Sequence, residues 1–358
     1  MSLIVITSDP QDELVLRNFT NKPEQRHKKI FDMLHNQFSV DEKLNVIFHI
    51  HNSLENFNTE TIKSLNVHDD KMLDYLENCH TSFLQYPDKL FSDYEHSGIV
   101  PYNFTHGIIK LEKIYQLCYW RQSGHWCSDQ ITPIFADTFE TALLSAQNCF
   151  NVKNHLSLNT RQTIYCLNVY PGHHAHYNKY GGYCFLNNGA ICAKSLLAHT
   201  ETKRLAILDL DHHAGDGTAD IFKDNPDVIT VSIHANTNNE YPYYTCEDET
   251  NNDTNNKFIS FEQNCGLEKY LKHINDSIDF INRSKIDCLI IAFGADTYKL
   301  DPDASDIANC GLEISDYAVI SSTIRSNFFD IPIIVTQEGG YNVTDIDKIL
   351  KSFLGSLV

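Results

Sequence analysis

The chain has 358 residues, of which 42% are hydrophobic, enough for one large α/β domain or two ordinary ones with a sizeable core. Its 28 Lys and Arg against 47 Asp and Glu give a formal net charge of −19, which repels phosphate backbones and argues against a nucleic-acid partner. A cationic small molecule or a basic protein tail suits this charge better, although the charge can also serve solubility alone.

Cysteine usage and the absence of long apolar runs indicate the compartment. The eleven cysteines are scattered without a CxxC pair, as expected of reduced thiols inside a cell. No run approaches the roughly 18 apolar residues of a membrane helix, and the apolar start "MSLIVITSDP" has no basic region before it. The sequence therefore predicts a cytoplasmic protein that does not enter the membrane, and it leaves export without a recognisable signal open.

Short apolar runs alternate with helical patterns along the chain. Strands are predicted over 3–7, 46–50, 163–169, 204–210, 228–233, 287–293 and 331–336, and helices over 23–35, 137–150, 187–199, 266–281 and 313–324. Runs that are apolar throughout suit strands buried on both faces of a parallel sheet. The predicted fold class is α/β, an open, mostly parallel sheet with helices on both faces, in a single domain over 1–358. The polar stretch 236–257 is predicted to be a long surface loop.

Acidic and imidazole side chains follow two of these strands. In "AILDLDHHAGDG", Asp211 and His213 are two residues apart, so on extended backbone both point to the same side. Asp296 follows another strand, and the carboxyl ends of parallel strands share one edge. Two carboxylates and one imidazole leave a position open, as in a catalytic zinc site. An isolated Asp-x-His would instead suggest a helix cap and an ordinary loop histidine.

The stretch "PGHHAHYNKYGGYCFLNN" places His173 and His174 after a strand, where a turn can aim both at one substrate. Each would need a carboxylate to set its tautomer and basicity. Asp209 and Asp216, which flank the candidate metal ligands, are predicted to supply them. In "QEGGYN", Tyr341 follows another strand, and its phenol can donate a hydrogen bond to an oxyanion. Alone, the His pair would suggest a solvated His-rich loop, and "QEGGYN" would suggest an aromatic side chain packed on the core.

Five motifs in this order and spacing resemble the zinc-dependent deacetylases, the superfamily of histone deacetylases and acetylpolyamine amidohydrolases. They are "PGHHAH…YGGYCFLNN", "DLDHHAGDG", "SIH", "GADTYKLDP" and "QEGGYN". The stretches "GHWCSDQITPIFADTFETAL" and "SIHANTNNEYPYY" are more similar to the acetylpolyamine amidohydrolase branch. One position departs from the family, which has a second His after the zinc-binding one where this chain has Ala214.

This resemblance implies an arginase/deacetylase fold and one Zn²⁺ on Asp211, His213 and Asp296, with Fe²⁺ as a possible substitute. It implies that His174 is the general base, that His173 is the general acid or electrostatic partner, and that Tyr341 polarises the acetyl carbonyl. Further implied positions comprise a substrate-binding set (Gly182, Tyr183 and Tyr241) and a structural K⁺ site (Asp209, the backbone oxygens of Asp211 and His213, and Ser232).

The implied reaction is metal-dependent hydrolysis of an N-acetyl amide to acetate and a free amine. Two other classes remain as alternatives. A binuclear manganese ureohydrolase shares the fold, but its second metal would need Asp where this chain has Gly215 and Tyr298. A non-catalytic acetyl-amine binding homologue is disfavoured because every proposed catalytic position holds a competent residue.

Acetylated polyamines are the preferred substrates, and acetyl-lysine of proteins or histones is the alternative. Asp303 stands where polyamine-directed relatives can carry an acid near the tunnel mouth, and Glu95 is a second candidate. Such relatives are often dimers, so a homodimer is a further expectation. Residues of about 85–130 are expected to form an insert that narrows the site.

Overall fold

The computed structural model describes residues 2–9, 23–38, 45–51, 54, 57–86, 88, 91–93, 97–105, 110–243 and 255–358. Its centre is one eight-stranded sheet with strand order β2-β1-β3-β8-β7-β4-β5-β6, and every pairing is parallel. The predicted α/β class with an open parallel sheet is therefore confirmed. The strands are β1 (Ser2–Ser8), β2 (Asn45–His51), β3 (Thr163–Leu167), β4 (Leu205–Asp209), β5 (Val228–Ala235), β6 (Asn256–Phe261), β7 (Cys288–Phe293) and β8 (Ile333–Gln337).

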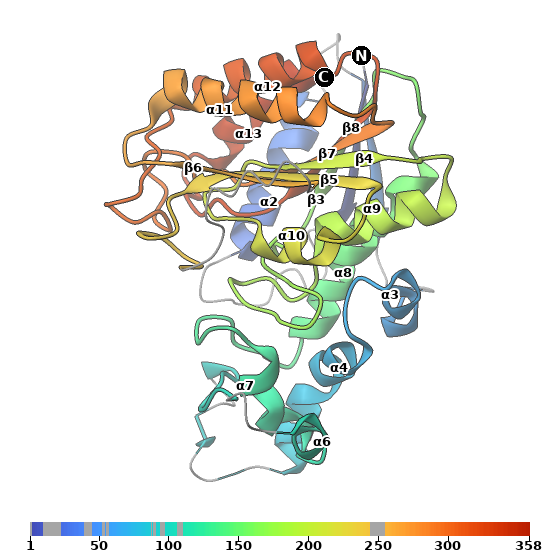
Figure 1. The fold of residues 1–358 in the computed structure, drawn as a ribbon, viewed down its shortest axis with the longest axis vertical. Helices are drawn as coiled ribbons and strands as arrows, with labels where there is room; N and C mark the ends of the chain where they lie inside the picture. The colour runs from blue at the N-terminus through green and yellow to red at the C-terminus, as the bar shows by residue number, and fades with distance from the viewer. Residues whose placement is uncertain are drawn as a thin grey trace.

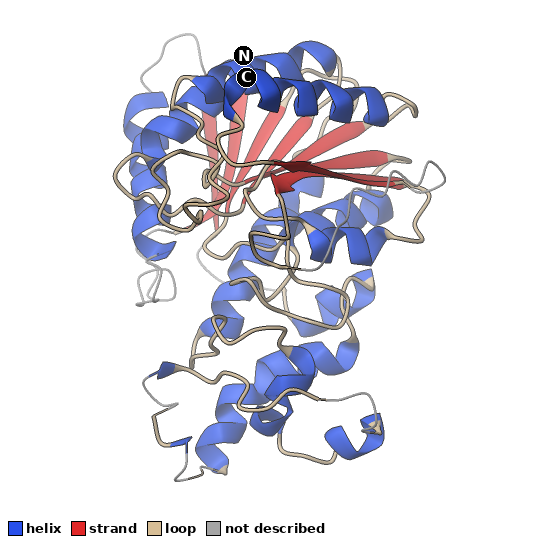
Figure 2. Cartoon of the chain, turned by 60° about the vertical axis from the view of Figure 1, so that its left-hand side comes forward, coloured by secondary structure: helices blue, strands red, loops and turns tan. Residues whose placement is uncertain are grey.

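Helices cover both faces of the sheet, as Figure 2 shows. In β1, Leu3 and Val5 point into a core shared with α2, α11, α12 and α13, whereas Ile4 and Ile6 point into a core shared with α3, α4, α8, α9 and α10. Both faces are buried, which explains why these strands are apolar without alternation. The helices are α2 (Pro23–Met33), α3 (Thr59–Leu65), α4 (Asp70–Gln85), α6 (Leu111–Ile114), α7 (Ser123–Trp126), α8 (Thr138–Phe150), α9 (Asn188–His199), α10 (Asp216–Phe222), α11 (Gly266–Ile281), α12 (Asp316–Asn327) and α13 (Ile346–Leu357).

Strand β6 was not predicted, because its first residues belong to the polar stretch that the sequence predicts to be a loop. It begins inside the predicted loop 236–257 and pairs with β5 at the edge of the sheet. An edge strand pairs with a single neighbouring strand. Four of the six residues of β6 are partly exposed, so the strand has few apolar residues that would identify it in the sequence. The remainder of the loop is described up to 243, and 244–254 lie outside the described residues.

Helices α4, α6 and α7 form the end of the molecule furthest from the sheet (Figure 1). Aromatic contacts connect α4 to the segment that ends in α7: the ring centroids of Phe83 and Trp120, which lies in the 3-10 helix Tyr119–Gln122, are 5.6 Å apart, and those of Tyr75 and Trp126 are 6.4 Å apart. These residues belong to the core that also covers one face of the sheet. The predicted insert of about 85–130 falls in this end, and Glu95 lies outside the described residues. None of the helices described is long and apolar enough to cross a bilayer.

The sheet order decides which chain segments meet. Strands β3, β8, β7 and β4 are consecutive neighbours in the sheet although they are far apart in the sequence. Their carboxyl ends therefore lie side by side, and ligand sites of parallel sheets form at this edge. The histidine pair, the three proposed metal ligands and Tyr341 all follow these four strands, whereas Ser232 and Tyr241 belong to or follow β5.

Candidate active site

A cavity of about 230 Å³ opens at the carboxyl edge of the sheet. It is lined by Ile131, His173, His174, Gly182, Tyr183, Asp211, His213, Glu240, Tyr241, Tyr243, Asp296, Asp303 and Tyr341. Every residue predicted to act in catalysis, to bind substrate or to hold the catalytic metal is in this set, except Glu95, which lies outside the described residues. Asp209, Asp216 and Ser232 lie behind the wall.

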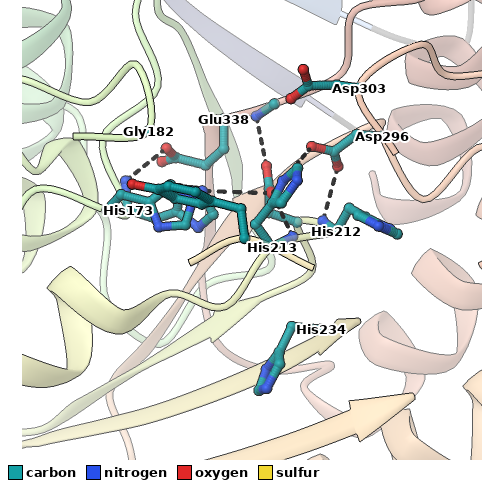
Figure 3. Close-up of polar contacts among 12 residues, drawn as sticks. His173, Gly182, His212, His213, His234, Asp296, Asp303 and Glu338 are labelled. Carbon is teal, nitrogen blue, oxygen red and sulfur yellow. Dashed lines mark hydrogen bonds and ion pairs between the residues drawn. The ribbon is translucent and has the colours of Figure 1, made fainter. Parts of the chain in front are cut away.

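Asp211, His213 and Asp296 form a buried group that lines the cavity. Figure 3 shows His213 and Asp296 close together. His213 Nδ1 lies 3.3 Å from Asp211 Oδ1 and 3.6 Å from Asp296 Oδ2. The Gly339 N–H donates to Asp211 Oδ2 at 2.7 Å, and the His212 N–H donates to Asp296 Oδ1 at 2.9 Å. The backbone therefore fixes both carboxylates while leaving one oxygen of Asp296 free.

This group fits a divalent cation. Asp296 Oδ2 is buried and accepts no hydrogen bond from the described residues, which is costly unless another partner is supplied. Burial and the charge of Asp211 raise the pKa of Asp296 to about 8. One ligand atom from each of the three residues lies within 4.8 Å of the others. A cation among them would neutralise both carboxylates and satisfy the free oxygen.

The histidine pair is held by the two flanking carboxylates. His173 Nδ1 lies 3.0 Å from Asp209 Oδ2, and His174 Nδ1 lies 2.7 Å from Asp216 Oδ1. The two imidazole centroids are 4.0 Å apart. Because each Nδ1 is engaged by a carboxylate, each Nε2 is the nitrogen available to a substrate.

The surroundings shift the pKa values of these two histidines in opposite directions. Burial alone would lower the pKa of His173, but the charges of Asp211 and Asp209 raise it to about 10. Burial and the charge on His173 lower the pKa of His174 to about 4, against the opposing effect of Asp216. At neutral pH one ring is therefore cationic and its neighbour neutral, which is the arrangement that an acid and a base require.

Glu338 is a site residue that the sequence reasoning missed, although it stands in the quoted "QEGGYN". Its Oε2 accepts the N–H groups of Gly172 and His173 at 2.5 and 3.2 Å, as Figure 3 shows for His173. Its Oε1 accepts from the Thr336 hydroxyl at 2.9 Å. This buried carboxyl group thus ties the end of β8 to the turn that carries the histidine pair.

Tyr341 follows β8 and is positioned through its backbone. Its N–H and that of Asn342 donate to Asp301 Oδ2 at 2.7 and 2.9 Å. Burial raises the pKa of the Tyr341 phenol well above its usual value, so the hydroxyl stays protonated and able to donate. Its ring lies 5.8 Å from that of Tyr183, at 74°.

Gly182, Tyr183 and Tyr241 form the walls of the cavity. Gly182 has φ +54°, and a Cβ there would come within 2.4 Å of the His174 ring and 2.9 Å of Tyr241, so the close approach requires glycine. The Tyr241 hydroxyl donates to Asp129 Oδ2 at 3.1 Å, and the Gly182 N–H donates to the same oxygen at 2.6 Å. Asp129, at the end of the predicted insert, was also missed, although it stands in the quoted stretch "GHWCSDQITPIFADTFETAL".

Two further carboxylates, Asp303 and Glu240, line the cavity. No lysine or arginine of the described residues forms an ion pair with either one. Burial raises the pKa of Asp303, and the nearby charges of Asp211 and Glu240 add to this effect. This wall is therefore acidic, and no basic residue that the structure describes pairs with it.

The positions of the expected potassium site are also adjacent. Asp209 pairs with Ser232 across β4 and β5. The Ser232 hydroxyl accepts from the Gly215 N–H at 3.1 Å. The backbone oxygens of Asp211 and His213 accept no hydrogen bond from the residues that the structure describes, so they are available to a cation.

Comparisons with known proteins identify the family of the chain. The family model described as "Histone deacetylase domain" matches residues 20–357. Acetylpolyamine amidohydrolase 1 of Pseudomonas aeruginosa is 33% identical over 241 residues, covering 65% of this chain and 67% of that protein. Histone deacetylase 8 of Arabidopsis thaliana is 29% identical over 227 residues, covering 61% and 59%. A crystal structure of acetylpolyamine aminohydrolase from Burkholderia pseudomallei has a TM-score of 0.81 at 22% identity, covering 100% of this chain and 98% of that one.

Proposed function

The chain belongs to the histone deacetylase domain family, and we propose that it hydrolyses N-acetyl amides to acetate and a free amine, with acetylated polyamines as its principal substrates. The observation that carries this proposal is the convergence of an Asp-His-Asp group, two His-Asp pairs and a phenol on one cavity. Several relatives named acetylpolyamine amidohydrolase support the choice of substrate.

Asp211, His213 and Asp296 would hold the catalytic metal. Zn²⁺ suits two carboxylates and one imidazole with an open position, and Fe²⁺ suits the same donors. When bound, such an ion supplies Lewis-acid polarisation of a carbonyl and acidifies water. The structural K⁺ that the family resemblance implies would lie at Asp209, Ser232 and the backbone oxygens of Asp211 and His213.

The histidines and Tyr341 would perform the proton transfers and stabilise developing charge. Neutral His174, held at Nδ1 by Asp216, accepts a proton from the attacking water at its Nε2. The Tyr341 hydroxyl donates a hydrogen bond to the carbonyl oxygen as negative charge develops there. A protonated histidine of the pair then delivers a proton to the leaving amine. The Gly182 carbonyl oxygen, which accepts from the Cys184 thiol at 3.3 Å, would accept the substrate N–H.

The acidic wall supports a cationic substrate. A polyamine that carries one acetyl group retains at least one ammonium, and Asp303 is placed to pair with it beyond the reacting amide. Tyr183 and Tyr241, which also line the cavity, would flank the aliphatic chain. An acetyl-lysine side chain has no second ammonium at this distance, so Asp303 would contribute less to its binding.

The site disfavours a binuclear ureohydrolase. A Cβ at Gly215 would lie 2.2 Å from Asp209 Oδ2, so a carboxylate side chain does not fit there. The Tyr298 hydroxyl donates instead to Asp345 Oδ2 at 3.2 Å. Neither position offers the extra carboxylate that a second manganese ion would need.

A side-by-side assay tests the proposal. Acetate release is measured from N-acetylputrescine, N-acetylcadaverine and an acetyl-lysine peptide, each with and without a zinc chelator. We expect higher kcat/KM for the two acetyldiamines and loss of all activity with the chelator. Preference for the peptide would favour the protein-deacetylase alternative. Tight binding of all three without acetate release would favour the non-catalytic homologue.

A further inference from the structure

His212 is a buried histidine that the proposed reaction does not use. It stands between the two proposed ligands Asp211 and His213, and its side chain is 0% exposed. Its N–H donates to Asp296, but neither ring nitrogen has a hydrogen-bond partner among the described residues. Burying two unsatisfied ring nitrogens is costly, so a native structure that retains them calls for an explanation.

Among the described residues, Glu240 supplies the carboxylate that lies within 4.0 Å of a ring nitrogen of His212. His212 Nε2 lies 3.6 Å from Glu240 Oε2, too long for a good hydrogen bond. Backbone N–H groups hold the carboxylate in place: Ser305 donates to Oε2 at 3.0 Å, and Tyr241 donates to Oε1 at 3.1 Å. The carboxylate is therefore fixed near the imidazole without bonding to it.

His213 completes the group. Its ring centroid lies 5.0 Å from that of His212, and the two planes are inclined at 82°. One ligand atom from each of His212, His213 and Glu240 lies within 4.8 Å of the others. Because His213 Nδ1 is directed at Asp211 and Asp296, the nitrogen left for this second group is Nε2.

We propose that His212, His213 Nε2 and Glu240 form a second divalent-cation site, distinct from the Asp211-His213-Asp296 group. Two imidazole nitrogens and one carboxylate are donors suited to Zn²⁺ and Co²⁺. An ion there would supply the missing partner of His212 Nε2 and neutralise a buried carboxylate. The two ions would share the His213 ring, which would bridge them as an imidazolate after releasing its remaining N–H proton to solvent, and they would share no carboxylate, unlike the pair of a binuclear ureohydrolase.

The position of Glu240 gives this site a consequence that rests on the proposed function. Glu240 lines the cavity beside Asp303, whereas His212 does not, so an ion would enter from the cavity and become part of its wall. The added positive charge would repel the distant ammonium of an acetylated diamine. Excess Zn²⁺ is therefore expected to raise KM for N-acetylputrescine more than for a neutral acetamide.

Cobalt binding tests the site without any measurement of activity. The full chain is freed of metal, and bound Co²⁺ is counted by equilibrium dialysis and followed by its visible absorption. We expect two Co²⁺ per chain for the parent protein and one for Glu240→Gln, in which the amide oxygen can still accept from Ser305. Asp296→Asn should retain the second ion and lose the first, and the double variant should lose both.

A matched control is His199→Gln, which removes an exposed imidazole at the end of α9 and should still bind two ions. His212→Gln is the second test variant if Glu240→Gln fails to fold, and it should bind one. A parent protein that binds a single ion, or a folded Glu240→Gln protein that binds two, would overturn the site. Absence of acetate release would contradict the proposed function and leave the cobalt count as an independent result.

Discussion

At the scale of single residues, the chemistry is distributed between side chains that reach the cavity and side chains that hold them. His173 and His174 are next to each other in the chain, yet their pKa values move in opposite directions, to about 10 and about 4. The difference arises because two carboxylates surround the first ring, whereas the second lies beside the cation formed by the first. Two neighbouring imidazoles thus acquire complementary roles from their surroundings.

The acidic wall gives a prediction about specificity. Asp303→Asn removes a carboxylate that no basic side chain of the described residues pairs with, so its partner would be the substrate. We expect KM for N-acetylputrescine to rise about 5-fold, equivalent to roughly 1 kcal/mol for a partly exposed ion pair, while KM for a neutral acetamide stays the same. Asp306→Asn, an exposed carboxylate in the same loop, is the control. Equal effects of Asp303→Asn on both substrates would remove this residue from substrate recognition.

At the scale of elements, the active site depends on links between strand ends. Glu338 connects the end of β8 to the turn after β3. Asp301, which follows β7, accepts from the backbone of Tyr341, which follows β8. Buried carboxylates that accept backbone N–H groups thereby fix three loops relative to one another. These contacts keep the two histidines and the Tyr341 phenol at constant positions in the cavity.

Glu338→Gln should show this positioning role in the kinetics. If the amide nitrogen faces the N–H groups of Gly172 and His173, a repulsive contact replaces a charge-assisted hydrogen bond. We expect kcat to fall about 10-fold, equivalent to roughly 1.4 kcal/mol, with KM nearly unchanged. Thr336→Val, which removes only the hydroxyl that donates to Oε1, should have a smaller effect. A rise in KM with kcat intact would argue instead for a contact with the substrate.

At the scale of the whole molecule, one buried histidine joins the helical end to the active-site loops. His68 precedes α4, and its Nδ1 hydrogen-bonds to the His176 carbonyl oxygen at 2.8 Å. Its Nε2 accepts from the Asn187 N–H at 2.9 Å, at the start of α9. The ring must be neutral to accept at Nε2, and burial lowers its pKa to about 4. His27, which contacts Thr7, has a pKa lowered to about 3 for the same reason.

These histidines predict a loss of stability in acid. An unfolded histidine takes up a proton near pH 6.5, whereas folded His68 resists it until about pH 4. Stability is therefore fully present above pH 6.5 and falls as the pH drops from there to about 4. Across that window we expect His68 alone to cost about 3 kcal/mol, measured by urea unfolding at a series of pH values. His68→Gln should reduce the slope, and His199→Gln should not. Equal slopes in the parent and His68→Gln proteins would contradict this role.

The sequence by itself determined the parallel α/β class and the family. Both follow from local information: apolar runs identify strands buried on both faces, and the spacing within "DLDHHAGDG" places Asp211 and His213 on one side of a strand end. The tertiary structure alone decided the strand order, the existence of β6, and the approach of Asp129, Glu240 and Glu338 to the cavity. These partners are up to 166 residues apart in the chain. Side-chain periodicity reports only which face of its own element a residue occupies. Which distant element covers that face depends on how the crossovers bring strands together. The proximity of His212 to Glu240 and the charge of the cavity wall are therefore decided by the tertiary structure.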